Sequence, residues 1–414
     1  MSDPAPVYML LVVAALMVGA YRVTYGRAAR ISDDASVSAL LGRGFSAQPR
    51  HHARLAAALC GLAGVGIYLA GMSLRGGPDP VLDALWLAAL IAGPGLFIVL
   101  SIRRVRPDFA ARARVERLAE SGLMALSLVA LVTTLGIIGS LLFEALLFFR
   151  EVSALEFLFG TQWSPQTAIR AGQIGQSGAF GAVPVLAGTF LITLIAMIVA
   201  APVGLMVAIY LSEYASARTR AVAKPAIEIL AGIPTVVYGF FALVTVGPAI
   251  RDGAALLGAD AAAQSALAAG LVMGVMIIPL VSSLSDDVIR AVPRSLRDAS
   301  TALGATRSET LRRVVFRSAL PGIIGAFLLA ISRAIGETMI VVMAAGRAAT
   351  LTANPLESVT TVTVQIVALL TGDQVFDSPR TLAAFALGLV LFVITLLLNI
   401  AALAVVNRYR VRFE

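Results

Sequence analysis

Residues 295–321 read S-L-R-D-A-S-T-A-L-G-A-T-R-S-E-T-L-R-R-V-V-F-R-S-A-L-P and contain two short helical patterns. Ser295 is followed three residues later by Asp298, and Thr306 is followed three residues later by Glu309. Each pair has the spacing of a capping box, in which two side chains satisfy the free backbone groups of a helix start. The segment is therefore predicted to contain two helix starts.

A single glycine, Gly304, separates the two patterns and stands where a helix stop is expected. Apolar residues recur at helical spacing on either side of it. They are Leu296, Ala299 and Leu303 in the first half, and Leu311, Val314 and Val315 in the second. The sequence predicts a hairpin of two amphipathic helices that meet at a glycine turn.

The composition around this hairpin is that of an integral membrane protein. Of the 414 residues, 59% are hydrophobic and only 14% are charged, which is too apolar for a soluble domain. Helical spans of the hydrocarbon core need about 20 apolar residues. Nine segments fit or nearly fit, near 6–21, 55–74, 81–101, 121–149, 184–211, 228–250, 266–285, 322–345 and 382–406.

The basic residues fix the predicted orientation of these spans. No Lys or Arg precedes the first span, whereas Arg22, Arg27 and Arg30 follow it, which is the reverse of a signal peptide. With the N-terminus outside, 25 of the 32 Lys and Arg residues fall in inner loops and six in outer loops. This bias follows the positive-inside rule and places the hairpin and the C-terminus in the cytoplasm. The excess positive charge then faces anionic lipid headgroups, and no nucleic-acid partner is expected.

The sequence also argues against several kinds of chemistry in this chain. Its one lysine, Lys224, precedes a proline, so the chain has no G-x-x-x-x-G-K-[ST] phosphate loop. If ATP drives this protein, a separate subunit must bind ATP and magnesium and hydrolyse the ATP. One cysteine, Cys60, excludes an internal disulfide, and the adjacent His51 and His52 have no metal-ligand spacing. We expect no cofactor, no metal and no catalytic residue.

Two blocks are predicted in this all-α fold. Residues 1–110 form an N-terminal extension of three membrane helices, in which no motif indicates a function. Residues 115–414 contain the other six spans, and the boundary is expected in the basic loop between Arg103 and Arg117.

The hairpin resembles the signature E-A-A-x-x-x-G-x9-I-x-L-P of permease subunits in binding-protein-dependent ATP-binding-cassette (ABC) importers. Val314 occupies the isoleucine position, whereas Phe316 and Arg317 stand where the family has Leu and Pro. The resemblance implies that the loop 286–321 docks on an ATPase subunit. The implied coupling residues are Asp298, Ala299, Ser300, Gly304 and Glu309.

Longer stretches resemble one branch of that family, the phosphate-specific transport (Pst) permeases of C type. They are A-G-I-P-T-V-V-Y-G at 231–239, D-D-V-I-R-A-V-P at 286–293, S-R-A-I-G-E-T-M at 332–339 and F-L-F-G-T-Q-W-S-P at 157–165. The resemblance implies a type I ABC importer core of six helices in the bacterial inner membrane, with inorganic phosphate as cargo. The implied partners are a homologous second permease (PstA type), a dimer of ATP-binding subunits (PstB type) and a periplasmic phosphate-binding protein.

Arg333 is predicted to lie inside a membrane span, where an arginine costs about 2.5 to 3.5 kcal/mol on insertion scales. Glu337 follows four residues later, so a continuous helix would place both on one face as an ion pair. One interpretation is a structural pair that fastens helices together. The interpretation we favour is that Arg333 faces the translocation path and binds phosphate oxygens, with Glu337 as its exchangeable partner.

A break is predicted in the span 228–250, because Pro234 interrupts the backbone ladder and has Gly232 and Gly239 beside it. Thr235 and Tyr238 are the side chains there that we expect to hydrogen-bond a passing oxyanion. Glu228, just before this break, is predicted to form a salt bridge with Lys224 or to reach the interface.

An apolar run at 362–370 in the last outer loop is too short to span and is predicted to lie in the interface or to re-enter the membrane. The resemblance makes this run and Trp163 candidates for contact with the binding protein, while interfacial anchoring explains both as well.

Three other functions remain open from the residues alone. An arginine in a pore does not distinguish phosphate from phosphonate, sulfate or molybdate. A secondary transporter driven by an ion gradient also contains buried Arg–Glu pairs and broken helices, but it needs no cytoplasmic docking hairpin. A regulatory membrane scaffold is left open by the uninterpreted N-terminal block.

Overall fold

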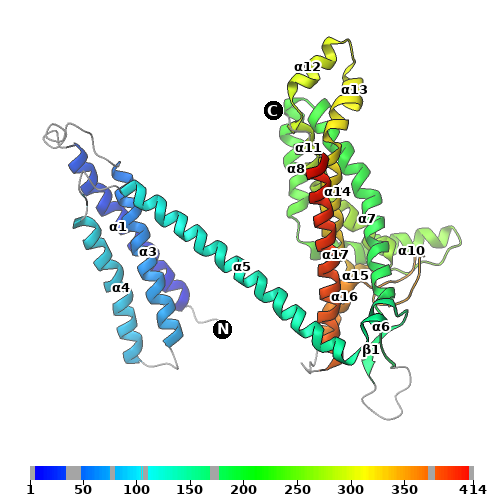
Figure 1. Cartoon of the computed structure of the whole chain (residues 1–414), viewed down its shortest axis with the longest axis horizontal. Helices are drawn as coiled ribbons and strands as arrows, with labels where there is room; N and C mark the ends of the chain where they lie inside the picture. The colour runs from blue at the N-terminus through cyan, green and yellow to red at the C-terminus, as the bar shows by residue number, and fades with distance from the viewer. Residues whose placement is uncertain are drawn as a thin grey trace. The chain divides into compact units, whose positions relative to one another are not determined.

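The computed structural model describes residues 5–33, 48–74, 80–103, 105, 111–167, 177–371 and 378–409, and it is almost entirely helical (Figure 1). The chain divides into two compact units, Met1–Leu135 and Gly136–Glu414. The division falls inside one long helix, α5 (Ala111–Glu151). The domain boundary expected at 103–117 stays a prediction.

The first unit contains three helices, α1, α3 and α4, each of which packs on the other two. Small or apolar side chains are buried at these contacts, among them Ala20, Ala56, Cys60 and Leu90. Three extra N-terminal helices thus precede the core, as predicted, and that each of them crosses the membrane stays a prediction. They are α1 (Ala5–Asp33), α3 (Pro49–Leu74) and α4 (Pro80–Arg103).

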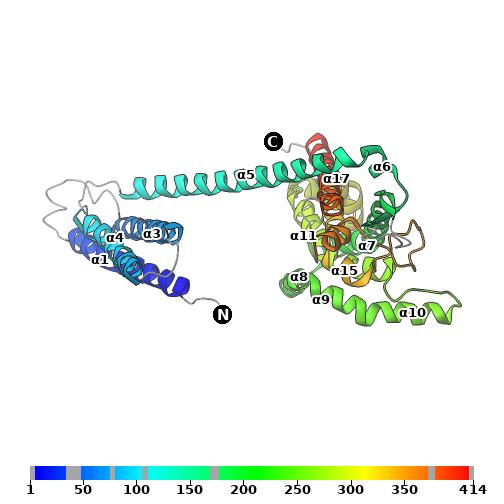
Figure 2. The same ribbon diagram turned by 90° about the horizontal axis from the view of Figure 1, so that it is seen from below.

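The second unit is built on α7 (Val183–Ile209) and α11 (Ala266–Ala291), which pack against each other along their lengths. Their shared core is rich in alanine, because small side chains let membrane helices approach closely. Two further helices, α14 (Phe316–Ile335) and α17 (Pro379–Tyr409), complete the bundle seen in Figure 2. The buried core includes Ile192, Ala196, Ala200, Ala269, Met273 and Ile277.

Six helices among the described residues are long and apolar enough to cross a membrane, and each overlaps one of the last six predicted spans. The bounds predicted as 322–345 are wrong, because the helix begins at Arg307 and ends at Ile335. Several of the six helices join consecutive elements through π-helical turns, labelled η. The six are Ala111–Glu151, Val183–Tyr214, Thr235–Leu256, Ala266–Ala291, Arg307–Ile335 and Pro379–Arg408.

The predicted span 228–250 is not one straight helix. It is divided between α8 (Ala217–Gly232) and α9 (Thr235–Phe241), with a non-helical step at Ile233 and Pro234. The chain then continues through η2 (Ala242–Val246) into α10 (Gly247–Leu256), which runs across the direction of α7 and α11 (Figure 1). The break predicted at Pro234 is confirmed.

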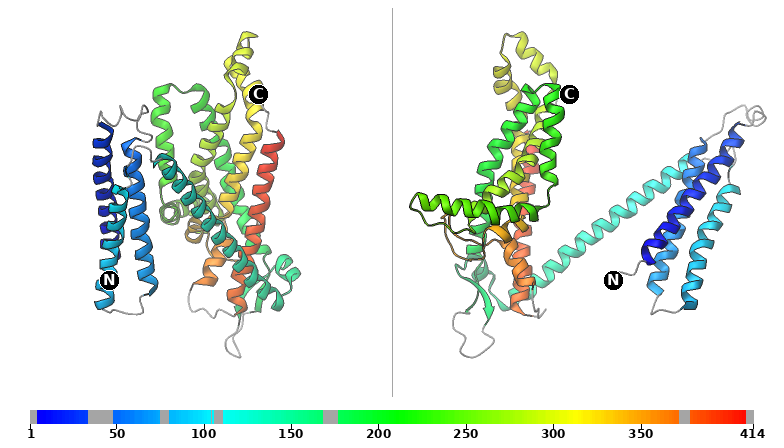
Figure 3. Two further views of the ribbon diagram at one scale, coloured as in Figure 1. Left: turned by 60° about the vertical axis from the view of Figure 1, so that its left-hand side comes forward. Right: turned by 180° about the vertical axis from the view of Figure 1, so that it is seen from behind.

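One end of the second unit carries the hairpin. Helix α12 (Arg294–Ala302) and helix α13 (Arg307–Thr310) project beyond the bundle, at the same end as the C-terminal end of α17 (Figure 3). The predicted pair of helices is thus confirmed, and α13 continues through η3 (Leu311–Val315) into α14.

The opposite end is closed by short elements around an aromatic cluster. Strands β1 (Trp163–Thr167) and β2 (Ser177–Phe180) pair antiparallel, with Trp163 opposite Phe180. Helix α16 (Val362–Leu370) packs against α17 and α7, and so forms a short element inside the unit, too short to span. The remaining short helices are α6 (Ala154–Phe159) and α15 (Met339–Ala344).

The two ends predict a labelling experiment. Leu303 beside the hairpin turn is 90% exposed, and Leu257 after α10 is 86% exposed. In a Cys60→Ala background, we expect Leu303→Cys to react with a membrane-impermeant thiol reagent only in inside-out vesicles. Leu257→Cys should react only in right-side-out spheroplasts. Labelling of both cysteines from the same side would contradict the predicted orientation.

Candidate functional site

The start of α13 has the predicted capping box. The backbone N–H of Thr306 donates to Glu309 Oε2 at 2.9 Å, and the backbone N–H of Glu309 donates to Thr306 Oγ1 at 3.3 Å. The other predicted box is wrong. Helix α12 begins two residues earlier than that box requires, with Pro293 at its N-cap and no capping side chain, so Ser295 already lies inside the helix.

The turn between α12 and α13 depends on Gly304, whose φ is +84°. That left-handed conformation is unfavourable for residues with a side chain, so the prediction of a glycine stop is confirmed. Asp298 and Ala299 are exposed on α12, and the Ser300 hydroxyl lies 3.0 Å from the Thr310 hydroxyl of α13. The apolar stripe predicted on α12 is only partly buried: Leu296 packs on the bundle, whereas Ala299 and Leu303 face outward.

The second arm of the hairpin is the first part of a membrane helix. Residues Arg307–Ile335 form one helix of 29 residues with a π-helical turn at η3. Leu311 and Val315 are buried in this turn and pack with Ile289 and Ile323. A displacement of α13 therefore acts directly on α14.

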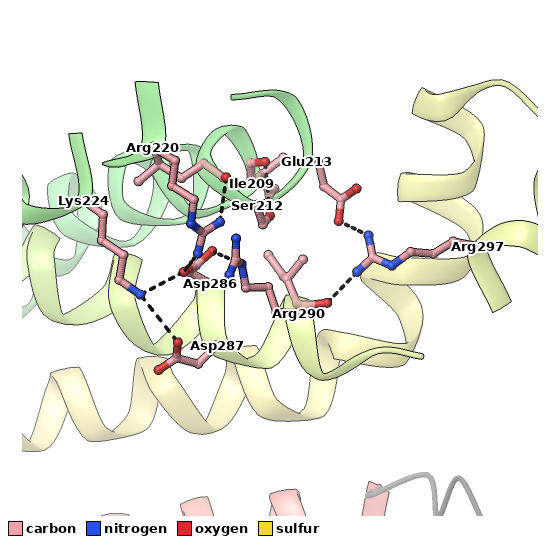
Figure 4. Close-up of polar contacts among 11 residues, drawn as sticks. Ile209, Ser212, Glu213, Arg220, Lys224, Asp286, Asp287, Arg290 and Arg297 are labelled. Carbon is pink, nitrogen blue, oxygen red and sulfur yellow. Dashed lines mark hydrogen bonds and ion pairs between the residues drawn. The ribbon is translucent and has the colours of Figure 1, made fainter. Parts of the chain in front are cut away.

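A buried carboxylate joins the helices below the hairpin (Figure 4). Asp286 on α11 is 2% exposed, and its Oδ2 accepts hydrogen bonds from Arg220 Nη2 at 2.6 Å and Lys224 Nζ at 3.2 Å. Arg290 Nε lies 3.5 Å from the other oxygen, and Lys224 Nζ lies 3.8 Å from Asp287 Oδ1. Of the two alternatives given for Glu228, the salt bridge with Lys224 is wrong, because Lys224 pairs with Asp286 and Asp287 of α11. That Glu228 reaches the interface stays a prediction.

Three arginines hold the π-helical turn η1 (Tyr210–Tyr214) at the end of α7. Arg220 also donates to the carbonyl of Leu211, at 2.8 Å. Arg297 on α12 donates to the Glu213 carboxylate and to the carbonyl of Ile289, and the latter contact is 2.7 Å (Figure 4). The Arg307 guanidinium lies 5.3 Å from the centre of the Tyr214 ring. Both arms of the hairpin are thus attached to α7 by charged side chains.

A tyrosine of α9, Tyr238, forms a hydrogen bond across the break to α8. The hydroxyl of Tyr238 donates to the carbonyl of Leu230 at 2.8 Å. The same carbonyl also accepts the backbone N–H of Ile233 at 3.3 Å, so two donors bind the last turn of α8 at the break. Tyr238 is buried, and its proton is therefore not directed at a passing oxyanion, contrary to the expectation. Thr235 begins α9 and is partly exposed, so it remains a candidate. Gly232 ends α8.

Gly239 brings this break close to a second one. A Cβ atom at Gly239 would lie 3.0 Å from the carbonyl oxygen of Met339 and 3.2 Å from Cα of Ile340, so only glycine fits without displacing α15. Met339 is the first residue of α15. The two interrupted segments therefore pack together.

The second break separates Arg333 from Glu337, which were predicted to lie on one helix. Helix α14 ends at Ile335 with Gly336 as its C-cap, so the pair does not share a helix face. Glu337 Oε1 instead accepts the backbone N–H of Met339 at 3.2 Å, and its carbonyl accepts from Thr363 Oγ1 at 2.8 Å. Arg333 is exposed and forms no ion pair with any residue that the structure describes. The predicted Arg333–Glu337 ion pair is wrong.

Sequence reasoning missed the role of Asp286, although that residue opens one of the quoted motifs. Its partners lie 62 and 66 residues away, too far for a local pattern to reveal. The available signal was a carboxylate at the inner end of an apolar span, which needs a buried cation nearby.

Comparisons with known proteins agree with this geometry. The family described as "Binding-protein-dependent transport system inner membrane component" matches residues 200–411. The chain belongs to this family.

Individual relatives indicate which branch of this family the chain is similar to. It is 35% identical over 246 residues to the probable ABC transporter permease protein YqgH of Bacillus subtilis, covering 59% of this chain and 75% of that one. It is 34% identical over 283 residues to the phosphate transport system permease protein PstC 1 of Mycobacterium tuberculosis, covering 62% and 83%. These matches support a PstC-type permease of an ABC importer in the inner membrane.

A solved bacterial alginate ABC transporter, in complex with an alginate pentasaccharide-bound periplasmic protein, is also similar. The identity is 14% and the TM-score is 0.47, over 71% of this chain and 97% of that chain.

The buried carboxylate predicts a large difference between two neighbouring aspartates. Asp286→Asn leaves Arg220 without its counter-charge and should lower the free energy of unfolding by about 3 to 5 kcal/mol. Asp287→Asn is the matched control, because Asp287 is 66% exposed and its single ion pair, with Lys224, is long at 3.8 Å. A loss of about 1 kcal/mol or less in the free energy of unfolding is expected for this variant. Thermal unfolding of the purified permease in detergent measures both. Equal losses would show that the cluster does not hold α8 on α11.

Proposed function

We propose that this permease is a transmembrane subunit of an ATP-driven importer of inorganic phosphate. The observation that carries the proposal is Arg333, an exposed arginine beside a helix break, with no carboxylate partner among the described residues. A guanidinium without a counter-ion in a membrane segment is costly, and an anionic cargo would offset that cost at each transport cycle. Its relatives include permeases named for phosphate transport.

Two further groups at the helix breaks are proposed to act on an oxyanion in the same path. Thr235 lies at the start of α9, and α9 contacts α15 through Gly239. Glu337 is partly buried and is held by backbone contacts at the break, so its negative charge limits how tightly an anion binds. Weak binding is what a translocation path requires, because the cargo must leave.

The hairpin is proposed to couple this path to ATP hydrolysis on separate subunits. Asp298, Ala299 and Gly304 are exposed at the hairpin, together with Leu303, and Ser300 and Glu309 fix its internal geometry. ATP and magnesium would be bound by a dimer of ATPase subunits that docks there. Closure of that dimer would move α13, and with it the helix that ends two residues after Arg333.

Two further partners complete the proposed importer. A second, homologous permease would form the other half of the path. This chain is 35% identical over 175 residues to the phosphate transport system permease protein PstA 1 of M. tuberculosis, which supports a pair of related permeases. A periplasmic binding protein would deliver phosphate at the end opposite the hairpin, with the N-terminus of this chain on that outer side. Membership of the ABC family does not favour a gradient-driven transporter.

Arg333→Ala should abolish phosphate uptake by the assembled importer, while the complex still forms at normal levels. The reason is the loss of the positive charge that compensates the anion in the path. Uptake of labelled phosphate into proteoliposomes measures it. Arg251→Ala is the control, because Arg251 pairs with its neighbour Asp252 on α10 and should leave uptake unchanged. Normal uptake by the Arg333 variant would refute the assignment, and full inhibition by sulfate or molybdate would identify a different oxyanion as cargo.

Gly304→Val should uncouple ATP hydrolysis from uptake, since a β-branched residue is strongly disfavoured at φ +84°. A left-handed conformation costs roughly 1 to 2 kcal/mol for a residue with a side chain. No atom lies within 4 Å of an added Cβ, so the effect would come from the backbone alone. Gly304→Asn is the control, because asparagine tolerates this conformation. Phosphate transported per ATP hydrolysed is the measurement, and equal ratios in both variants would argue against a rigid hairpin.

A further inference from the structure

The outer end of the second unit contains a cavity that the proposed path does not use. Its volume is about 410 Å³, and it lies among β1, the segment after α15, α16 and the start of α17. This end is opposite the hairpin (Figure 1). The described lining is Trp163, Ser164, Pro165, Arg347, Ala349, Gln365, Ala368, Leu369 and Arg380.

Two arginines from distant parts of the chain face this cavity, and no acidic residue is in its described lining. Neither Arg347 nor Arg380 forms an ion pair with a residue that the structure describes. Arg380 is the second residue of α17, so the free N–H groups and positive dipole of that helix start add to its charge. Two like charges on one cavity repel each other unless an anion lies between them.

One part of the cavity wall is polar, and its side chains already form hydrogen bonds within the protein. Trp163 Nε1 donates to Gln365 Oε1 at 2.9 Å, and Gln365 Nε2 donates to Thr360 Oγ1 at 3.0 Å. All three side chains are buried, so their geometry is fixed by the fold. Since Trp163 and Gln365 already have partners, Arg347 and Arg380 are the charged side chains of the described lining that can donate to a ligand, together with the hydroxyl of Ser164. Guanidinium groups bind tetrahedral oxyanions with paired N–H donors.

Helix α16 connects this cavity to the proposed translocation path. Gln365, Ala368 and Leu369 on α16 line the cavity, while Thr363 on the same helix donates to the carbonyl of Glu337 at 2.8 Å. One short helix therefore contacts both the cavity and the break beside Arg333.

We infer that this cavity is an outer oxyanion site, at which Arg347 and Arg380 bind the transported anion before it reaches Arg333. The identity of the anion as phosphate rests on the proposed function; the site itself rests on the two arginines and the buried wall. Because the cargo must move on, the site binds it weakly and reversibly.

Trp163 provides a direct probe of this site. The chain has two tryptophans, so Trp86→Phe leaves Trp163 in the cavity wall as the single indole. The full chain with this substitution, in lipid nanodiscs, is titrated with inorganic phosphate at constant ionic strength. We expect a saturable change in Trp163 fluorescence. Adding Arg347→Gln and Arg380→Gln should weaken the apparent affinity at least about tenfold, because the variant loses the charge-assisted hydrogen bonds to the anion.

Arg251→Gln in the same background is the matched control for general surface charge, because this exposed outer arginine lies outside the cavity lining. It should leave the titration unchanged. An unaltered emission maximum of Trp163 in the absence of anion verifies that the arginine variants keep the wall intact. In the assembled importer, the double variant should raise KM for phosphate several-fold while maximal uptake is largely retained.

The outcomes separate this inference from the proposed function. Absence of a saturable response to phosphate, in a chain whose importer takes up phosphate normally, overturns the outer site and leaves the function standing. An unchanged affinity in the double arginine variant also overturns it. A response to sulfate or molybdate, with none to phosphate and no phosphate uptake, supports the site and refutes phosphate as the cargo.

Discussion

Backbone groups freed inside an apolar environment must be hydrogen-bonded within the protein, and this constraint governs the second unit. Where α8 breaks, the Tyr238 hydroxyl binds the carbonyl of Leu230. Where α14 ends, the side chains of Glu337 and Thr363 supply bonds on either side of the gap. The polar residues near the breaks are thus partly structural, and each must be considered for that role before it is assigned to cargo.

The same constraint explains why the hairpin end is rich in arginine. The carbonyl of Leu211 in the π-helical turn after α7 accepts from Arg220, and the carbonyl of Ile289 near the end of α11 accepts from Arg297. Each of these arginines also binds a carboxylate, Asp286 or Glu213. A guanidinium has five N–H donors in a fixed planar arrangement, so it can bind a carbonyl and a carboxylate at the same time. A lysine ammonium has three donors and a less defined geometry. These contacts connect the hairpin with α7, α8 and α11 and allow a movement at the hairpin to reach all three helices.

Local signals in the sequence predicted those parts of the fold that depend on local geometry. The capping box at Thr306 and Glu309, the turn at Gly304 and the break at Pro234 each depend on residues within a few positions. The box expected at Ser295 failed because Pro293, which has no N–H to donate, provides an equally local helix start. The prediction of an Arg333–Glu337 pair failed for a similar reason. It needed one continuous helix through both residues, and α14 ends at Gly336. Contacts such as Trp163 with Gln365 join residues 202 positions apart, and no period or motif in a single sequence reveals them.

The arginines of the second unit can be divided by their partners, and this division bears on function. Arg220 and Arg297 are partly buried, and each binds a carboxylate and a backbone carbonyl. Their positive charges are therefore neutralised within the protein. Arg333, Arg347 and Arg380 have no carboxylate partner among the described residues, and all three are exposed in the isolated chain. An arginine that is compensated inside the protein gains little from an anion, whereas an uncompensated one lowers its free energy when an anion arrives. Among these five arginines, the positive charges available to the proposed anionic cargo are those of Arg333, beside the α14 break, and of Arg347 and Arg380, in the cavity at the end opposite the hairpin.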